Sequence, residues 1–267
     1  MAIYDVYGNI LCGNINDLLS VAKYKEIYST SSGQTQGSCI DDSGNIYTAQ
    51  YSAGKWVKYN IYSGSESTYS FTGGTYGHMN DLAYNPNNGY IYCASMNNTG
   101  EVYIFNPSNM NLVNTVYALD VNGNPYGMSN LAFNRNTDQF VSIYSNNQEM
   151  YFYDSSFQYV KHVLINDYYS TGTRQGGETD GRYYYHLISP NSGNSAIVPY
   201  TLDGVRAGDP IPVYPSASPE FEAMCFDWIN KRYFLQSYAN SAMKLWWIGI
   251  KEYDGDVFGL LEMSFPS

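Results

Sequence analysis

The chain has 267 residues, of which 44% are hydrophobic, and these values predict one large folded domain and exclude a wholly disordered chain. The formal net charge is −11 with only 13 Lys and Arg residues, so we expect neither a nucleic-acid polymer nor an anionic membrane as a partner. The sequence shows no signal-peptide pattern and no apolar run of about 18 residues, which favours synthesis in the cytoplasm without a membrane span.

The first elements expected along the chain are an arm and a strand. Residues 1–21 lie outside the repeat described below and are predicted to form an N-terminal arm. Such an arm either docks on a second copy or a particle, or packs on the domain itself. Ile15–Ala22 is the one segment that could form a short helix. Lys23–Tyr28, which follows, has the composition of an outer strand.

From residue 36 onward, one pattern occurs five times. Each copy has a polar or glycine-containing opening, a short apolar step, an Asp or Asn, a turn and then aromatic strand segments. The closing residues are Asp41, Asn85, Asn134, Asp180 and Asp227. They are separated by roughly 40 to 50 residues, the period of a four-stranded propeller blade. We therefore predict an all-β fold, a five-bladed β-propeller of four-stranded antiparallel blades over residues 22–267.

The later parts of each repeat fit the remaining strands of a blade. Second strands are predicted at Asn45–Gln50, Tyr90–Ser95, Gln139–Ser145, Tyr183–Ser189 and Tyr233–Ser237. Third strands are predicted at Trp56–Asn60, Glu101–Asn106, Met150–Asp154, Ala196–Tyr200 and Lys244–Ile250. Fourth strands are predicted at Thr68–Phe71, Leu112–Leu119, Tyr159–Ile165 and Ile211–Tyr214. The last blade still needs an outer strand, and Lys23–Tyr28 is predicted to supply it and close the ring, with Val257–Ser264 as the alternative.

Equivalent positions around the ring indicate a ligand site. Five residues before the closing Asp or Asn, every repeat has a polar residue, namely Gln36, Asn80, Ser129, Gln175 and Glu222. We expect these residues to face one mouth of the central channel, either as hydrogen-bonding groups for one ligand or as a rim that water satisfies.

One residue breaks the pattern deeper in the predicted channel. Two residues before the closing position, the ring is small except at Glu178. A carboxylate there would be costly without a partner, and Arg174 or Arg182 is the expected one. Glu178 is then a ligand contact, a catalytic group or half of a structural ion pair.

Residues on the adjoining loops extend this predicted surface. The further candidates are Tyr51, Tyr76, His78, Tyr126, Arg174 and Tyr238. Aromatic rings stack on sugar faces, and amides match sugar hydroxyls, so the composition favours a saccharide or another small polar ligand. The same composition also suits a protein contact.

No familiar catalytic or cofactor motif is present. The three histidines do not accompany a GxSxG turn, and no phosphate loop, dinucleotide motif or CxxC pair occurs, so we expect no cofactor and no metal. A glycan hydrolase or lyase would need two convergent carboxylates, for which Glu178 with Glu222 or Asp81 is the candidate pair. Because no acid–base set repeats, the sequence favours a protein that is not an enzyme.

Two blade openings resemble those of a known family. Gln36–Tyr47 and Gln175–Tyr184 are similar to blade openings in the five-bladed propellers of phage receptor-binding proteins of Gram-positive hosts and of related teichoic-acid-associated propellers. The resemblance implies binding of a cell-surface glycopolymer, with Gln36 and Gln175 at the family's blade-opening Gln. The other three repeats depart from it, with Asn80, Ser129 and Glu222 at that position.

Three functions follow from the sequence. The first is a phage-derived, non-enzymatic propeller that recognises a saccharide or teichoic-acid-like ligand as part of a virion tail. The second is a cytoplasmic sponge for a small molecule, such as a nucleotide signal, that counters host defence. The third is the glycan hydrolase or lyase.

Overall fold

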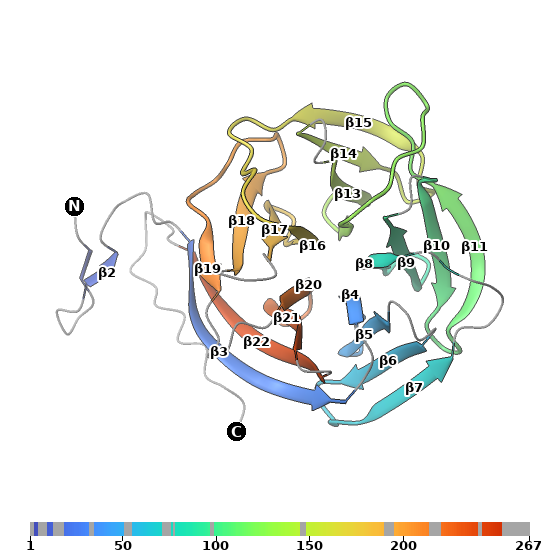
Figure 1. Cartoon of the computed structure of the whole chain (residues 1–267), viewed down its shortest axis with the longest axis horizontal. Helices are drawn as coiled ribbons and strands as arrows, with labels where there is room; N and C mark the ends of the chain where they lie inside the picture. The colour runs from blue at the N-terminus through green and yellow to red at the C-terminus, as the bar shows by residue number, and fades with distance from the viewer. Residues whose placement is uncertain are drawn as a thin grey trace.

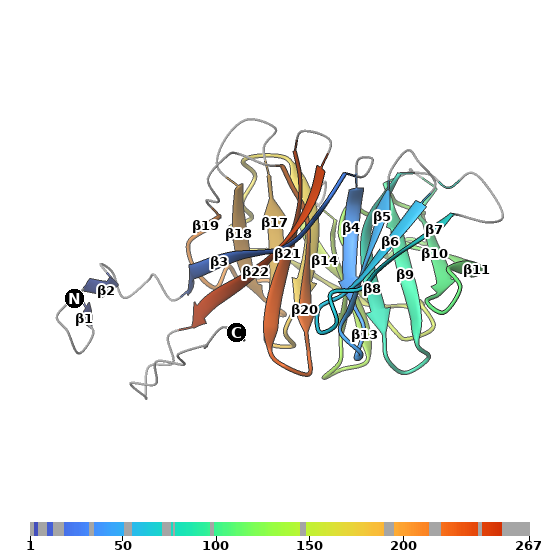
Figure 2. The same ribbon diagram turned by 90° about the horizontal axis from the view of Figure 1, so that it is seen from below.

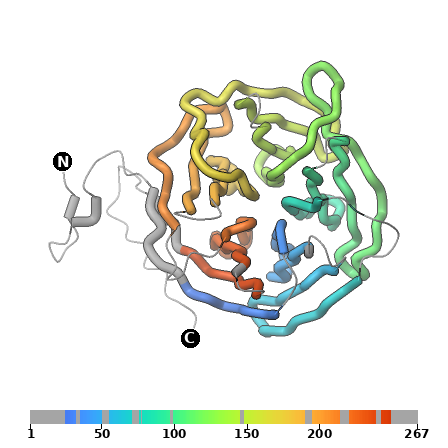
Figure 3. The backbone as a smooth tube through the Cα atoms, in the orientation of Figure 1, coloured from blue at the N-terminus to red at the C-terminus, as the bar shows by residue number. Residues whose placement is uncertain are grey.

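The computed structural model describes residues 3–4, 10–12, 19–31, 35–50, 55–70, 76, 78–96, 99–144, 148–189, 195–213, 220–239 and 242–252. Five four-stranded antiparallel sheets stand around one central axis, which confirms the predicted five-bladed β-propeller (Figure 1). Each blade runs from the axis outward, and blades consecutive in sequence are neighbours in the ring (Figure 3). No helix long and apolar enough to cross a membrane occurs within these ranges.

The blades have the following strands, given from the axis outward. Blade 1 has β4 (Thr35–Ile40), β5 (Asn45–Gln50), β6 (Lys55–Asn60) and β7 (Glu66–Ser70). Blade 2 has β8 (Met79–Asn85), β9 (Tyr90–Ser95), β10 (Glu101–Asn106) and β11 (Asn111–Tyr117). Blade 3 has β12 (Ala132–Asn134), β13 (Gln139–Tyr144), β14 (Glu149–Tyr153) and β15 (Tyr159–Leu164). Blade 4 has β16 (Arg174–Thr179), β17 (Tyr183–Ile188), β18 (Ser195–Thr201) and β19 (Ile211–Val213). Blade 5 has β20 (Glu220–Asp227), β21 (Arg232–Ala239), β22 (Ala242–Glu252) and β3 (Leu19–Thr30).

The ring is closed by the N-terminal strand. β3 pairs antiparallel with β22, with Tyr24 opposite Ile248, and so becomes the outer strand of blade 5, as predicted for Lys23–Tyr28. The short helix considered for Ile15–Ala22 is wrong over residues 19–22, which belong to β3. The alternative closing strand Val257–Ser264 lies outside the described residues. β1 (Ile3–Tyr4) and β2 (Ile10–Cys12) pair only with each other, beside the propeller (Figures 1 and 2).

The core is divided into five clusters, one between each pair of neighbouring blades. Inner and middle strands are buried on both faces, so their apolar residues pack against the blades on either side. Between blades 1 and 2, for example, the ring of Trp56 meets that of Phe105 edge to face at 4.9 Å. This arrangement explains the abundance of aromatic residues in the middle strands.

The repeated Asp or Asn stabilises the turn that follows each inner strand. Asp41 Oδ1 accepts hydrogen bonds from the backbone N–H of Ser43 and Asn45, both at 2.9 Å. The other four closing residues accept a bond from the residue two positions later in the same way. A short polar side chain that mimics a turn carbonyl is what this position requires. The most regular feature of the repeat is therefore structural.

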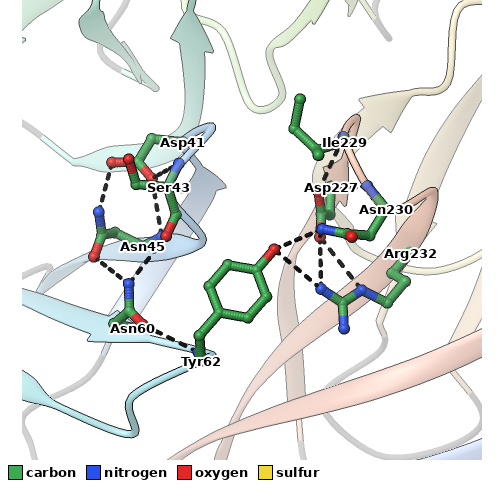
Figure 4. Close-up of polar contacts among 9 residues, drawn as sticks. All are labelled: Asp41, Ser43, Asn45, Asn60, Tyr62, Asp227, Ile229, Asn230 and Arg232. Carbon is green, nitrogen blue, oxygen red and sulfur yellow. Dashed lines mark hydrogen bonds and ion pairs between the residues drawn. The ribbon is translucent and has the colours of Figure 1, made fainter. Parts of the chain in front are cut away.

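The first and last blades also meet where the turn between β6 and β7 of blade 1 contacts the turn after β20 of blade 5. The Tyr62 hydroxyl accepts hydrogen bonds from Asn230 Nδ2 and from Arg232 Nη2 of blade 5, and the Tyr62 backbone N–H donates to Asn60 Oδ1 in blade 1 (Figure 4). Arg232 is in turn paired with Asp227 at 2.9 Å. Polar contacts thus reinforce the seam between the two blades.

Candidate binding site at the upper mouth of the channel

We name the end of the channel at which the inner strands begin the upper mouth, and the opposite end the lower mouth; the upper mouth faces upward in Figure 2. At the upper mouth, four of the five inner strands have a register shift where they pair with the second strand. The shifts fall at Gln36, Asn80, Gln175 and Glu222. A β-bulge changes the direction in which the side chain of its extra residue points. The backbone therefore gives these four polar side chains a different orientation from the rest of their strands.

The fifth ring position is built differently. Ser129 precedes β12, which begins only at Ala132. The side chain of Asn130 substitutes for the missing ladder, because its Oδ1 accepts from the Ile143 N–H at 2.7 Å and its Nδ2 donates to the Ile143 carbonyl at 3.0 Å. Blade 3 therefore reaches the upper mouth with a backbone segment, and the Ser129 carbonyl accepts a hydrogen bond from Asn80 Nδ2.

All the ring residues except Ser129, which is half-buried, are buried, and this argues against a rim that is merely in contact with bulk water. Gln36 is 5% exposed, Asn80 2%, Gln175 5% and Glu222 1%. Gln36 Oε1 lies 2.7 Å from His78 Nε2, and the Gln36 carbonyl accepts from Gln236 Nε2 at 2.9 Å. Burial lowers the pKa of His78, which favours its neutral imidazole, and Nε2 forms the contact with the Gln36 amide.

Glu222 differs from the other members of the ring. Neither of its carboxyl oxygens has a hydrogen-bond partner among the described residues. Burial raises the pKa of Glu222 to about 9, and the nearby Glu220 carboxylate adds to the shift. Glu220 itself accepts a hydrogen bond from Gln175 Nε2 at 3.1 Å. Glu222 therefore stands at the upper mouth as a buried, neutral carboxylic acid, and neither oxygen has a hydrogen-bond partner among the described residues.

One level below, Asp81 closes the channel. Its carboxylate accepts hydrogen bonds from the backbone N–H of Leu82 at 3.0 Å, Leu131 at 2.9 Å and Gly177 at 2.8 Å, so it ties blades 2, 3 and 4 together. The inner strands approach closely here, since a Cβ on Gly37 would lie 2.6 Å from Asp81 Cα. This approach gives the glycine after the blade-opening Gln a steric reason. Asp81 is fully satisfied and is not available for acid–base chemistry.

Glu178 lies toward the lower mouth. Its oxygens accept from the backbone N–H of Thr179 at 2.8 Å and of Phe226 at 3.1 Å, so the expected ion pair with Arg174 or Arg182 is wrong. Burial raises its pKa to about 8. Glu178 is two residues before the closing residue of its inner strand, and Glu222 is five residues before that of its own strand. The two positions are therefore three residues apart along the channel, which is roughly 10 Å in strands that rise about 3.3 Å per residue. Asp81 lies between these levels, so the structure does not assemble the carboxylate pair considered for a glycan hydrolase.

The loop candidates are distributed unevenly. Tyr51 lies outside the described residues. Tyr76 packs edge to face on Tyr103 at 5.1 Å, in the core between blades 1 and 2. Arg174 Nε donates to the Tyr168 hydroxyl at 2.8 Å at the start of β16, and Tyr238 is half-buried near the end of β21, opposite Glu220.

Tyr126 belongs to the core of the fold. It is 4% exposed, and its hydroxyl accepts a hydrogen bond from Tyr153 at 2.8 Å. We therefore leave Tyr126 out of the site at the upper mouth.

Sequence reasoning missed Gln236. This second-strand residue is buried, it bonds to the Gln36 carbonyl, and its own Oε1 has no partner in the described part of the chain. A buried amide beside a bulge was the only available signal, and bulges are not visible in the sequence. No group of three or more His, Cys, Asp or Glu side chains within the described ranges is arranged to hold a metal ion.

No family model matches the chain, and no curated protein matches its sequence. Its fold is similar to that of several solved propellers. Glutaminyl cyclase from Myxococcus xanthus has a TM-score of 0.64 at 12% identity, covering 88% of this chain and 97% of that one. Regucalcin, a calcium-binding protein from Agrobacterium tumefaciens, has a TM-score of 0.57 at 11% identity, covering 88% and 96%. A luciferin-regenerating enzyme has a TM-score of 0.50 at 9% identity, covering 86% and 97%.

These neighbours correct one expectation from the sequence. The prediction that the chain is not an enzyme is wrong. Two of the three similar propellers are enzymes by name, and their structures align with 88% and 86% of this chain. None of the three is a phage receptor-binding protein, so that resemblance stays a prediction. At these identities the likeness establishes the propeller fold and assigns no reaction.

Proposed function

We propose that the upper mouth binds a small, uncharged polar molecule and exchanges a proton with it through Glu222. The observation that carries this proposal is the state of Glu222, which is 1% exposed and has no partner for either oxygen in the described part of the chain. Burying a carboxyl group without a hydrogen bond costs free energy, and a ligand that pairs with it would offset that cost.

The neighbouring groups favour an uncharged ligand. The amides of Gln36, Gln175 and Gln236 lie in the same region, each within or opposite a bulge, and amides donate as well as accept hydrogen bonds. The net charge of −11 opposes an anion. Of the predicted ligands, a neutral saccharide therefore suits the site better than a phosphate-bearing teichoic acid or a nucleotide.

The chemistry available to Glu222 is general acid–base catalysis. With its pKa raised to about 9, the carboxyl group holds a proton near neutral pH and can donate it to a leaving oxygen or nitrogen. Saccharides are the first substrate class to test. Glutaminyl peptides are the second, suggested by the name of the similar cyclase. The expected virion or cytoplasmic location and the docking role of the arm stay predictions.

The test is to find the ligand and then remove the acid. Mass spectrometry of the denatured protein reveals any molecule retained through purification, and thermal-shift screening with mono- and disaccharides and glutaminyl dipeptides finds weaker ones. For a substrate identified in this way, Glu222→Gln should lower turnover by about 10²- to 10⁴-fold, the usual contribution of a positioned acid. The product is followed by liquid chromatography.

The matched control is Glu101→Gln, at a glutamate on a third strand, away from the channel, that accepts hydrogen bonds from the Thr99 and Tyr103 hydroxyls. It should bind and turn over the ligand as the wild type does. Undiminished turnover in the Glu222→Gln protein would show that the proposal is wrong.

A further inference from the structure

The lower mouth contains a small cavity that the proposed function does not use. All five blades contribute to it, through residues that include Ile40, Tyr84, Arg135, Glu178 and Trp228. The cavity encloses about 10 Å³, enough for about one water-sized group. Asp81 and the close approach of the inner strands lie between it and the upper mouth, so the two ends of the channel are separate sites.

Arg135 lies across this cavity. From blade 3 it reaches Asp42 of blade 1, which its Nη1 contacts, and its guanidinium lies 6.0 Å from the ring centre of Tyr84 and 5.6 Å from that of Trp228. The Arg135 side chain is 16% exposed, whereas the Asp42 side chain is 43% exposed. A cationic side chain is therefore held between two aromatic walls, and its ionic partner is the more solvent-exposed of the two groups.

The guanidinium has unused capacity. Its Nε is buried and has no hydrogen-bond partner in the described part of the chain. The Asp42 carboxylate accepts a hydrogen bond only from Nη1. A guanidinium is a planar fork that binds both oxygens of a carboxylate, so a single contact leaves the fork half used.

At the inner end of the same cavity, Glu178 is 8% exposed. Its two oxygens accept from main-chain N–H groups, and when it is protonated its O–H can still donate.

We propose that the lower mouth is a second ligand site that binds a small free carboxylate, with Arg135 as the cationic partner in place of Asp42 and Glu178 as a hydrogen-bond donor. Because the cavity holds only one water-sized group, one carboxylate oxygen of a short acid enters it toward Glu178, and the rest of the acid takes the place of the Asp42 carboxylate at the rim beside the guanidinium. This site is independent of the chemistry proposed for Glu222, and either proposal can fail without the other.

The experiment is a titration with sodium formate and sodium acetate at about pH 6, with sodium chloride keeping the ionic strength constant. Binding is followed by tryptophan fluorescence, and the Trp228→Phe variant identifies the part of the signal that comes from the cavity. The wild type should show saturable binding. Asp42→Asn removes the competing carboxylate and should bind about fivefold more tightly, the factor expected for an exposed ion pair.

Arg135→Gln should lose the binding, and the matched control Arg232→Gln, at a second paired arginine near the same rim, should keep it. Wild-type binding should weaken above about pH 8 as Glu178 ionises, while Glu178→Gln should bind equally at both pH values. If Asp42→Asn shows no saturable signal with either acid, or if Arg232→Gln loses binding as Arg135→Gln does, the proposal is overturned. The gain expected for Asp42→Asn keeps the test valid even where the Arg135 variant folds poorly.

Discussion

Each mouth of the channel has a buried glutamate, and the two glutamates are held in different ways. Glu178, toward the lower mouth, accepts hydrogen bonds from two main-chain N–H groups at 2.8 and 3.1 Å. Glu222, at the upper mouth, has no partner in the described structure. Burial raises the pKa of both, to about 8 and about 9. A raised pKa therefore does not by itself separate an acid that the main chain holds in place from one without a partner; the hydrogen bonds do.

The backbone is regular around the lower mouth, where Glu178 lies, and irregular around the upper mouth, where Glu222 lies. The lower mouth is bordered by five turns that a side-chain oxygen stabilises at each closing Asp or Asn. The upper mouth is bordered by four register shifts that break the ladder beside polar residues. Regular turns secure the scaffold, and bulges present groups for binding. Variants of the two glutamates should therefore behave in opposite ways.

The largest expected effect is a gain of stability in Glu222→Gln at alkaline pH. Glu222 ionises near its ordinary value in the unfolded chain but only at about 9 in the folded one. Between those pH values the folded state holds the extra proton, so the free energy of unfolding falls as pH rises, by at most about 1.4 kcal/mol per pH unit. Gln cannot ionise. At about pH 8 the variant should be more stable by up to about 5 kcal/mol, the slope accumulated from about pH 4.5.

Urea unfolding of both proteins at about pH 4.5, 6 and 8, followed by fluorescence, measures this difference. The advantage of the variant should shrink as the pH is lowered and disappear near pH 4.5. Equal unfolding midpoints at pH 8 would mean that Glu222 is paired or hydrated and would remove the basis of its proposed role.

The second effect is a loss of stability in Glu178→Gln. An amide offers one oxygen, whereas the carboxyl group accepts from Thr179 on one oxygen and from Phe226 on the other. One main-chain N–H would then face an amide NH₂ group in a buried site, which costs about 1–3 kcal/mol. The same urea experiment at about pH 4.5, below the range in which ionisation of either glutamate in the unfolded chain lowers stability, should show this loss, while Glu222→Gln at that pH should show none. A Glu178 variant as stable as the wild type would contradict the assigned hydrogen bonds.

The propeller and its closure could be predicted from the sequence because they depend on local signals repeated five times. The closing Asp or Asn marks each turn, and Lys23–Tyr28 reads as an outer strand without a blade of its own; both were confirmed. The helix at Ile15–Ala22 was wrong over residues 19–22 because pairing with β22 outweighed the local preference.

The candidate site could be predicted only in part. Alignment on the closing residue located the polar ring, including Glu222, but bulges and hydrogen bonds between blades depend on contacts across the channel. The sequence therefore could not show that Asp81 is saturated by three N–H groups or that Gln236 approaches Gln36. It also could not show that the partner of Arg135 is Asp42, 93 positions away.

The smallest effect tests whether the seam between the first and last blades contributes to the stability of the lower mouth. Tyr62→Phe keeps the ring and removes the hydroxyl that accepts from Asn230 and Arg232 (Figure 4). Tyr62 is 58% exposed, and Arg232 keeps its bond to Asp227, so the loss should be only about 0.5–1 kcal/mol. Thermal unfolding should show a midpoint a few degrees lower at every pH from about 5 to 8. A loss that grew with pH would instead indicate that the seam is coupled to the channel carboxyls, and the two mouths would then no longer be independent.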